Sequence, residues 1–580
     1  MKNKKKYPRV PVGIEDFEEI RKGSYCYSDK SILIEEIIEG SFKVALFARP
    51  RRFGKTLNLS MLRYFFDVNY QKPEGMGKRH LFEGLKIAKN EYLCNEHMNK
   101  YPVISLSFKG IKYKEHNLFL DHLREFFAFE FKKFRYLLNS PISTPKDKLT
   151  ISNLLSGTAS EAELCMSIKL ITNLLEEHHK EKVYLFIDEY DAPIHFAYSH
   201  GTYRDCADFF SVLYGNALKG NSAVEKVVMT GILRVSKESI FSDVNNVSVF
   251  TVLETNYSPY FGFLEHEVKT LVESYDLQDQ LPQVQTWYNG YRFGNNSTGI
   301  YNPWSILQWL ANEAHELKPY WVNTSKNDII RTLYLEQKHS LKPEFFDLFL
   351  GKSIKAEVNT ETTFDANLTQ NPAIFWGFML QTGYLTVTDK IFENNKYIYT
   401  LKIPNEEIHI VFRNMVDAWF ETLSKDLKKP NLAETISQAL VQRKLEIFYK
   451  NLQQILIQTM SYHDFNRNPE NAFHAFMAGF MVWLTGNYDV RSNRESGIGR
   501  YDLCLIPKKE SIPAYLFEFK SIAYLEEKAP SAEKIEQELK LALKQIDTQL
   551  YETELESRGV RQITKVALVF YGKQVWMEYK

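Results

Sequence analysis

Residues 42–67 read FKVALFARPRRFGKTLNLSMLRYFFD and join an apolar run to a basic loop and an amphipathic run. The apolar run, residues 42–48, predicts a buried strand, and the run that begins at Leu57 predicts a helix. A strand, a glycine turn and a helix N-terminus form the framework of a phosphate-binding loop. The stretch therefore predicts a site for an anionic phosphate ligand.

The basic loop RPRRFGKT contains the residue types that such a site uses. Gly54 suits the turn, Lys55 can reach the β- and γ-phosphates of ATP, and the Thr56 hydroxyl can ligate Mg²⁺. Arg52 is a further candidate for nucleotide binding within the loop. Arg49 stands where the standard pattern has another glycine, so the motif is degenerate. A basic surface turn before a helix is the alternative.

Further strand and helix signals follow along the N-terminal half. The apolar runs at residues 102–108, 182–187 and 226–232 predict buried strands. Residues 118–137 and 160–178 carry apolar side chains at helical spacing. Short apolar strands that alternate with helices indicate an α/β fold with a parallel sheet.

Acidic residues end the second of these strand runs, in the sequence VYLFIDEYD. We expect Asp188 to bind Mg²⁺ and Glu189 to polarise an attacking water molecule, as in phosphoryl transfer. A pair of solvated acids at a strand end is the alternative. The strand VVMTGI is expected beside the Asp188 strand, which would place Thr230 near the γ-phosphate. Arg234 would then contact a phosphate or a neighbouring domain, or form an ordinary salt bridge.

The pattern changes twice along the chain. Residues 256–460 are mostly helical, with a hairpin predicted over residues 383–403, and we interpret them as a lid or connecting region. An α/β pattern returns after that, and a strand over residues 565–571, KVALVFY, is expected to close the chain. We therefore expect three domains, over residues 1–255, 256–460 and 461–580.

Aromatic residues surround glycine and proline turns in WYNGYRFG and IYNPWSI, residues 287–294 and 300–306. This pattern favours a lid that is held together by packed aromatic rings. The functional alternative places Arg292 and Asn302 against a nucleotide or substrate.

Three charged residues interrupt the C-terminal strand pattern. Residues 501–520 read YDLCLIPKKESIPAYLFEFK and predict two strands, with Asp502 on the first and Glu518 and Lys520 on one face of the second. Burying such charges without partners would cost several kcal/mol. A divalent metal between Asp502 and Glu518 would remove much of that cost, and Lys520 could act on water or on the phosphate. Oxygen ligands suit Mg²⁺ or Mn²⁺ better than zinc.

Auxiliary residues for this site are expected nearby in the sequence. Glu470 precedes a predicted helix over residues 471–484 and can supply another acid, for which Glu495 is the rival. Gln545 lies on the predicted helix over residues 531–552. A structural Glu518–Lys520 ion pair without chemistry is the alternative.

The N-terminal motifs resemble a known family. The stretches FARPRRFGKTLNLSML, VYLFIDEYDAPI, TGILRVSKESIFSDVNN and YNPWSI are similar to the AAA-ATPase-like domain of many bacterial proteins, over about residues 8–330. That family has an arginine at the position of Arg49, so the missing glycine does not argue against binding. The resemblance implies a P-loop site for ATP and leaves turnover open.

The C-terminal motifs SNRESGIGRYDLCLIP, YLFEFK and LALKQI resemble the branch of the PD-(D/E)XK nuclease superfamily that is commonly fused behind that domain. The resemblance covers about residues 462–571. It implies that Asp502, Glu518 and Lys520 are catalytic and that Glu470 and Gln545 assist them.

Composition restricts the partners. The chain has 72 Lys plus Arg and 72 Asp plus Glu, so any nucleic-acid surface must be a local patch. The 5 Cys form no CxxC pair, which argues against a zinc site and favours reduced thiols. The basic start is followed by no apolar signal region, and no window of ~18 uncharged apolar residues exists. We expect a cytoplasmic protein without a membrane partner.

Together these features predict a protein that binds and hydrolyses ATP and that carries a Mg²⁺- or Mn²⁺-dependent nuclease acting on nucleic acid, with DNA preferred. A nucleotide-dependent switch or assembly protein, whose nuclease-like domain only binds, is one alternative. A nucleotidase or RNA-directed enzyme is another. The sequence leaves a homo-oligomer open.

Overall fold

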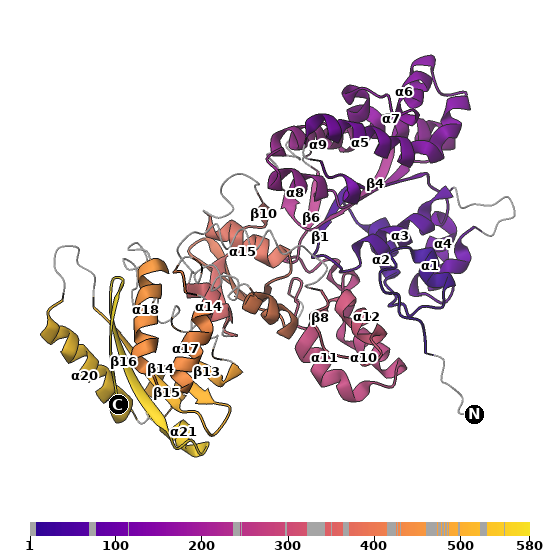
Figure 1. The fold of residues 1–580 in the computed structure, drawn as a ribbon. Coiled ribbons are helices and arrows are strands. Elements are labelled where there is room, and N and C mark those ends of the chain that lie inside the picture. Colours follow the sequence, from indigo (N-terminus) through magenta and orange to yellow (C-terminus); the bar gives the residue numbers. More distant parts are fainter. Residues whose placement is uncertain are drawn as a thin grey trace. The chain divides into compact units, whose positions relative to one another are not determined.

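The chain forms two compact units. The first comprises Met1–Ser325 with Lys355–Glu407, and the second comprises Lys326–Ile354 with Ile408–Lys580 (Figure 1). The chain therefore leaves the first unit twice. The computed structural model describes residues 7–68, 77–113, 115–235, 244, 246–295, 298–321, 343–349, 351–362, 371–414, 425, 427–429, 431–459, 473, 477, 481, 484, 486–496, 499–522, 530–549 and 551–580. The three-domain division at residues 255 and 460 stays a prediction.

A five-stranded parallel sheet forms the centre of the first unit. In spatial order its strands are β2 (Val103–Ser107), β3 (Val183–Asp188), β4 (Val224–Gly231), β1 (Val44–Ala48) and β6 (Val247–Phe250). Strands β1 and β3 are buried along their whole length, which explains their continuous apolar sequences. The predicted parallel sheet is confirmed, and β4 lies beside β3 as expected.

Helices cover the two sides of this sheet (Figure 1). The predicted helices over residues 118–137 and 160–178 correspond to α5, with a 3₁₀ segment after it, and to α7. Ser160 and Glu163 form the capping box of α7. The helices are α1 (Phe17–Lys22), α2 (Ile32–Glu39), α3 (Lys55–Phe66), α4 (Glu91–His97), α5 (His116–Phe131), α6 (Pro145–Leu155), α7 (Glu161–His179), α8 (Ala192–Ser199) and α9 (Tyr203–Leu218).

The remainder of the first unit packs small elements around the end of the sheet. The predicted hairpin is confirmed as β11 (Thr386–Glu393) and β12 (Lys396–Lys402), and Asn394 and Asn395 take positive φ in its two-residue turn. A third strand, β9 (Ile354–Glu357), lies beside β12 and was not predicted from the sequence. The other elements are β5 (Arg234–Val235), β7 (Phe263–Leu264), α10 (Glu265–Ser274), α11 (Leu281–Tyr288), β8 (Ile300–Tyr301), α12 (Pro303–Ala311), β9 (Ile354–Glu357), β10 (Glu361–Thr362) and α15 (Pro372–Gln381).

The second unit is built on a mixed five-stranded sheet in chain order. Its strands are β13 (Tyr488–Ser496), β14 (Gly499–Pro507), β15 (Ala514–Ser521), β16 (Ile563–Tyr571) and β17 (Gln574–Tyr579). Only β15 and β16 are parallel among these neighbours, and α20 makes the crossover between them. The described helices are α14 (Pro343–Phe349), α17 (Leu432–Val441), α18 (Leu445–Thr459), α20 (Ala532–Thr548) and α21 (Thr553–Ser557).

The C-terminal strand predictions are confirmed for β14, β15 and β16, but two strands were missed. The prediction that the strand over residues 565–571 closes the chain is wrong, because β17 follows it and pairs with it. Of the helix expected over residues 471–484, most lies outside the described residues; Phe473, Met477 and Met481 are helical and buried. None of the helices in the described parts of the chain is both long and apolar enough to cross a membrane.

One acidic side chain is completely buried in the first unit. Glu407 is 0% exposed, and its carboxylate accepts hydrogen bonds from the Ser305 hydroxyl (2.7 Å) and from the Trp321 backbone N–H (2.6 Å). Burial raises the pKa of Glu407 to about 7, against these hydrogen bonds, which lower it. The folded protein therefore holds a proton at Glu407 that an unfolded chain has lost above its ordinary pKa.

This difference predicts a pH-dependent stability. The stabilising proton is fully present below about pH 4.5, and its contribution is lost as the pH rises through about 7. Glu407→Gln, which resembles the protonated acid, should match the wild type near pH 4 and be about 3 kcal/mol more stable near pH 8. Calorimetric unfolding of both proteins from pH 4 to pH 8 checks this. Parallel curves would contradict it.

Candidate functional site

The loop between β1 and α3 has the backbone of an anion site. Gly54 precedes the first residue of α3 with φ 85°, and Arg52 has φ 67°. A Cβ atom built on Gly54 would lie within 4 Å of no other atom, so there is space for a side chain. The left-handed backbone conformation is therefore what favours glycine at this position. The loop lies at the carboxyl end of a parallel strand and at a helix N-terminus, where phosphate groups bind in α/β proteins.

Lys55 is folded back against this loop. Its Nζ donates to the carbonyl oxygens of Arg49 (2.9 Å) and Pro50 (2.8 Å). Burial lowers the pKa of Lys55 to about 8, and the carboxylates of Asp188, Asp191 and Glu189 oppose that shift. The three carboxylates therefore stabilise the charged form of the Lys55 side chain even without a ligand.

The structure brings together three of the residues predicted to act on the phosphates. The Thr56 hydroxyl donates to Asp188 Oδ2 (2.8 Å), and the Thr230 hydroxyl donates to Asp188 Oδ1. Asp188 is 5% exposed at the end of β3. A hydroxyl beside a carboxylate is a set of hard oxygen donors, which fits Mg²⁺.

Glu189 directly follows Asp188 and faces the solvent-accessible part of the site. It lines the cavity described below and has φ 51°, a backbone conformation that costs energy for a residue other than glycine. Burial raises the pKa of Glu189, and the neighbouring Asp188 raises it further. An acid with a raised pKa in a cleft suits proton transfer.

Asp191 has a structural task instead. Its carboxylate accepts the backbone N–H groups of Ile232 and Leu233, both at 2.9 Å, and contacts His195 Nε2 at 3.2 Å. Burial raises the pKa of Asp191, but the hydrogen bond and the charge of His195, together with the two backbone hydrogen bonds, lower it by more. The net shift of the pKa is therefore downward. Asp191 thus fixes the turn after β4.

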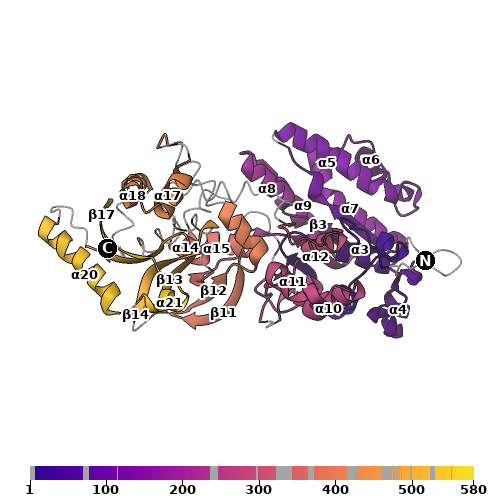
Figure 2. The same cartoon turned by 60° about the horizontal axis from the view of Figure 1, so that its bottom comes forward.

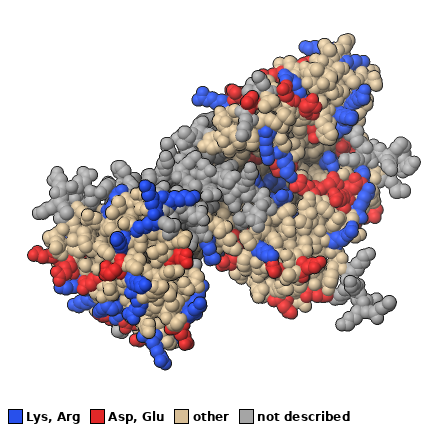
Figure 3. Space-filling model, in the orientation of Figure 1, with Lys and Arg blue, Asp and Glu red and all other residues tan. Residues whose placement is uncertain are grey.

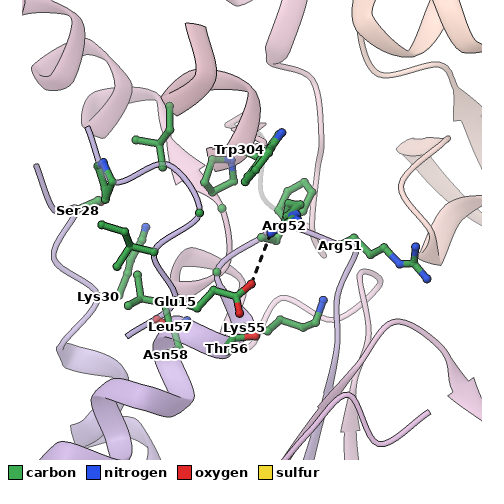
Figure 4. A pocket seen from close by; sticks show the side chains of 18 of the residues that line it. Glu15, Ser28, Lys30, Arg51, Arg52, Lys55, Thr56, Leu57, Asn58 and Trp304 are labelled. Carbon is green, nitrogen blue, oxygen red and sulfur yellow. Dashed lines mark hydrogen bonds and ion pairs between the residues drawn. The ribbon is translucent and has the colours of Figure 1, made fainter. Parts of the chain in front are cut away.

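A cavity of ≈ 350 Å³ opens over the phosphate loop (Figure 4). It extends from Lys55 and Thr56 to the N-terminal segment around Ser28. The Arg52 guanidinium lies 4.1 Å from the ring centre of Trp304 and 3.5 Å from the Glu15 carboxylate. Neither Trp304 nor Glu15 was predicted to contact the loop, because both reach it from segments that are far away in the sequence.

Arg49 and Arg234 have partners that explain them structurally. The Arg49 guanidinium is fully buried, donates to the Phe250 carbonyl oxygen (3.1 Å) and lies over the Phe293 ring (5.0 Å). Arg234 forms an ion pair with Glu361 at 2.5 Å. This contact agrees with the alternative that Arg234 forms an ordinary salt bridge. The geometry gives Arg234 no contact with the phosphate loop, so its nucleotide role stays a prediction.

Two candidates in the aromatic stretches are likewise structural. The Asn302 side chain accepts the Trp304 backbone N–H (2.9 Å) and caps α12. Arg292 Nη1 donates to the Thr388 carbonyl oxygen (3.3 Å). Tyr288 and Tyr301 of these stretches lie in one hydrophobic core with the neighbouring Trp309, as the packing interpretation expects, whereas the role of a lid stays a prediction.

The second predicted site lies where β14 and β15 face each other. Their pairing places Cys504 opposite Leu516; Asp502 lies two residues before Cys504, and Glu518 lies two residues after Leu516. Residues opposite each other in an antiparallel pair share a face, as do residues two apart in a strand. Asp502, Glu518 and Lys520 therefore project to one side of the sheet.

That side is the one that α20 covers. Cys504 and Leu516 share a core with Leu543 and Ile546 of α20, whereas the opposite side of the sheet packs on α17 and α18 (Figure 2). Because β15 is covered on both sides, its charges lie in a buried strand, as the sequence predicted.

Lys520 contacts two neighbouring side chains, and Asp502 contacts the backbone between Glu518 and Lys520. Lys520 Nζ lies 3.3 Å from Glu518 Oε1 and donates to Gln545 Oε1 of α20 at 2.7 Å. Glu518 is 2% exposed, whereas the Lys520 side chain is 25% exposed. Asp502 Oδ2 accepts the Phe519 backbone N–H at 2.7 Å. The structure thus brings Glu518, Lys520 and Gln545 together, with Asp502 hydrogen-bonded to the backbone between Glu518 and Lys520; that these residues form an active site stays a prediction.

The additional acid stays undecided. Glu470 lies outside the described residues, and Glu495 is placed on β13 by its backbone alone. Within the described parts of the chain, no three side chains of His, Cys, Asp or Glu gather as a metal-binding group. Asp502 and Glu518 are thus a two-carboxylate set, whose oxygen atoms fit Mg²⁺ or Mn²⁺.

Comparison with known proteins agrees with this geometry. Residues 11–241 match the family described as predicted AAA-ATPase, and residues 468–580 match the PD-(D/E)XK nuclease superfamily. The chain is also 24% identical over 534 residues to a protein of Azotobacter chroococcum mcd 1 that is described as an uncharacterized protein in the vnfD 5′ region. That match covers 89% of each chain. This chain therefore carries an AAA-ATPase-like domain followed by a PD-(D/E)XK nuclease superfamily domain.

Proposed function

We propose that the protein binds and hydrolyses ATP and that its C-terminal domain cleaves phosphodiester bonds of nucleic acid, with DNA as the preferred substrate. The observation that carries this proposal is the contact of Thr56 and Thr230 with Asp188 beside Lys55, in a domain joined to an Asp502–Glu518–Lys520 cluster. The two domain families support a nucleotide-binding protein with a nuclease-like domain. Hydrolysis, DNA and the metals are the proposed refinements.

In the N-terminal domain, Lys55 and the loop N–H groups would bind the phosphates. Mg²⁺, when bound, would neutralise charge on the β- and γ-phosphates. Thr56 and Asp188 would hold that ion, and Thr230 would keep the Asp188 carboxylate oriented. Glu189 would accept a proton from the attacking water, consistent with its raised pKa.

In the C-terminal domain, two carboxylates and a lysine would act in phosphodiester cleavage. Mg²⁺ or Mn²⁺, when bound, would activate water and polarise the scissile phosphate. Asp502 and Glu518 would hold the ion. Lys520, oriented by Gln545, would stabilise the negative charge that develops on the phosphate.

The surface is compatible with a local contact to nucleic acid. Lys and Arg side chains are mixed with Asp and Glu over the face shown in Figure 3, in keeping with equal totals of 72 basic and 72 acidic residues. All 5 Cys are free thiols, which supports the proposed cytoplasmic location. A nucleotide-dependent switch is the second candidate, and the Glu189 test below separates it.

Lys55→Ala should weaken ATP binding at least about tenfold, because a hydrogen bond to a charged group contributes about 1.5–3 kcal/mol. Isothermal calorimetry on the full chain measures this. Lys182→Ala is the matched control, since Lys182 is a half-exposed surface residue paired with Glu225. Equal ATP affinity of wild type and Lys55→Ala would reject the phosphate-loop assignment.

Glu189→Gln should retain ATP binding and slow hydrolysis about 10²–10⁴-fold, the usual contribution of a general base. Phosphate release under saturating ATP measures this, with Glu225→Gln as a surface control for the same substitution. Normal turnover in Glu189→Gln would remove its catalytic role. Nucleotide binding without turnover in the wild type would favour the switch.

Asp502→Ala and Glu518→Ala should each lose metal binding and nucleic-acid cleavage together. Lys520→Ala should keep its metal affinity but cleave about 10²–10³-fold more slowly, because its cation acts on the transition state. Mn²⁺ calorimetry and cleavage of single- and double-stranded DNA and RNA measure both properties.

Asp547→Ala is the control for the carboxylate variants, because Asp547 lies on the same domain and pairs with Lys565 away from the cluster. Cleavage by Asp502→Ala and Glu518→Ala at the wild-type rate would show that the active site is elsewhere.

A further inference from the structure

Two residues of the first unit lie at the points where the chain leaves it. Trp321 shortly precedes Ser325, the last residue of the first segment, and Glu407 is the last residue of the second segment. The Trp321 backbone N–H donates to Glu407 Oε1 at 2.6 Å. The two exits toward the nuclease-bearing unit are therefore tied to each other inside the first unit.

The same tryptophan holds the phosphate loop. Its indole Nε1–H donates to the Arg51 carbonyl oxygen at 3.2 Å. The two preceding carbonyl groups, of Arg49 and Pro50, accept from Lys55. Three consecutive loop carbonyls are thus held, two by the phosphate-binding lysine and one by Trp321.

Nucleotide binding would compete with this arrangement. An ammonium group has three donors, and Lys55 uses two of them on the loop carbonyls. Contact with both the β- and the γ-phosphate would either share the one remaining donor between two oxygens or draw on the other two. Phosphate oxygens therefore compete with the Arg49 and Pro50 carbonyls for Lys55, next to the carbonyl that Trp321 holds.

Close packing leaves little room to absorb that change locally. Trp321 is 2% exposed and its ring lies 5.2 Å from the Tyr384 ring. A Cβ atom built on Gly383 would lie only 3.0 Å from Pro50 Cβ. A shift of the loop carbonyls is therefore passed to their neighbours, as expected in an interior packed like a crystal.

Glu407 connects this contact to the lid as well. Its second carboxylate oxygen accepts the hydroxyl of Ser305, on α12. The preceding residue, Trp304, carries the Arg52 guanidinium of the phosphate loop on its ring. The loop thus reaches Glu407 by two routes, through Trp321 and through α12.

We propose that Trp321 and Glu407 are positioning residues that transmit nucleotide occupancy of the phosphate loop to the chain segments entering the nuclease-bearing unit. This inference rests on the proposed ATP binding. It adds a defined link between the two activities, which neither domain family supplies.

Substitutions of Trp321 and Glu407 can remove these hydrogen bonds while the residues that bind ATP stay unchanged. Trp321→Phe keeps an aromatic ring beside Tyr384 and removes the donor to Arg51. Trp309→Phe is the matched control, because Trp309 is also fully buried and its indole donates to the His315 carbonyl oxygen (2.9 Å), away from the loop. Glu407→Leu removes the acceptor of the hydrogen bonds from Trp321 and Ser305. Glu407→Gln keeps an oxygen acceptor for Trp321 and should restore transmission.

Hydrogen exchange of the full chain with and without ATP–Mg²⁺ tests the proposal. Wild type and Trp309→Phe should show slower exchange in phosphate-loop peptides, and a change of at least about fivefold in peptides covering residues 405–414, a typical lower bound for coupled sites. Trp321→Phe and Glu407→Leu should respond in the loop only, and Glu407→Gln should respond like the wild type.

Two results would overturn the link while leaving ATP binding intact. One is a response at residues 405–414 in Trp321→Phe and Glu407→Leu that equals the wild type. The other is a wild type whose loop is protected without any response at residues 405–414. A wild-type loop that ATP does not protect would instead overturn the proposed function, and the link with it.

Discussion

The carboxylate of Asp188 is the contact on which the nucleotide site depends. It joins the ends of β3 and β4 to the start of α3 through the hydroxyls of Thr230 and Thr56. A buried carboxylate is costly unless hydrogen bonds or a cation compensate for lost hydration. Two hydroxyl donors and the nearby Lys55 provide that compensation here. The same arrangement leaves hard oxygen donors at the phosphate loop, which suit the Mg²⁺ that we propose for this site.

The second unit meets the same constraint on a different sheet. Glu518 interrupts a strand that is buried on both sides; Lys520 contacts Glu518 and donates to Gln545 of α20. Asp502 reaches across from β14 and accepts a backbone N–H of β15. In both units, a carboxylate that would be expensive alone is retained beside a lysine. That pattern is typical of sites that handle phosphate and divalent metal.

The sequence predicted the elements whose signal is local. Strands β1 and β3 are continuous apolar runs, and Gly54, Lys55 and Thr56 are adjacent, so short-range patterns sufficed. Strands β13 and β17 were missed; QVWMEY at the C-terminus mixes polar and apolar side chains and leaves its buried face ambiguous. The roles of Arg49 and Arg234 also required the structure, because Phe250 and Glu361 are far away in sequence. The contacts of Glu15, Trp304, Trp321 and Glu407 around the loop join segments that are far apart in the sequence, so no local pattern predicted them.

Manganese anomalous diffraction from crystals of the full chain grown with a non-hydrolysable ATP analogue is the most direct test of this account. We expect one peak at the nucleotide phosphates, ligated by Thr56 beside Asp188, and another shared by Asp502 and Glu518, with metal–oxygen distances of about 2.0–2.6 Å. Nucleotide and manganese bound away from these carboxylates, or neither carboxylate set holding metal at saturating Mn²⁺, would contradict the central claim.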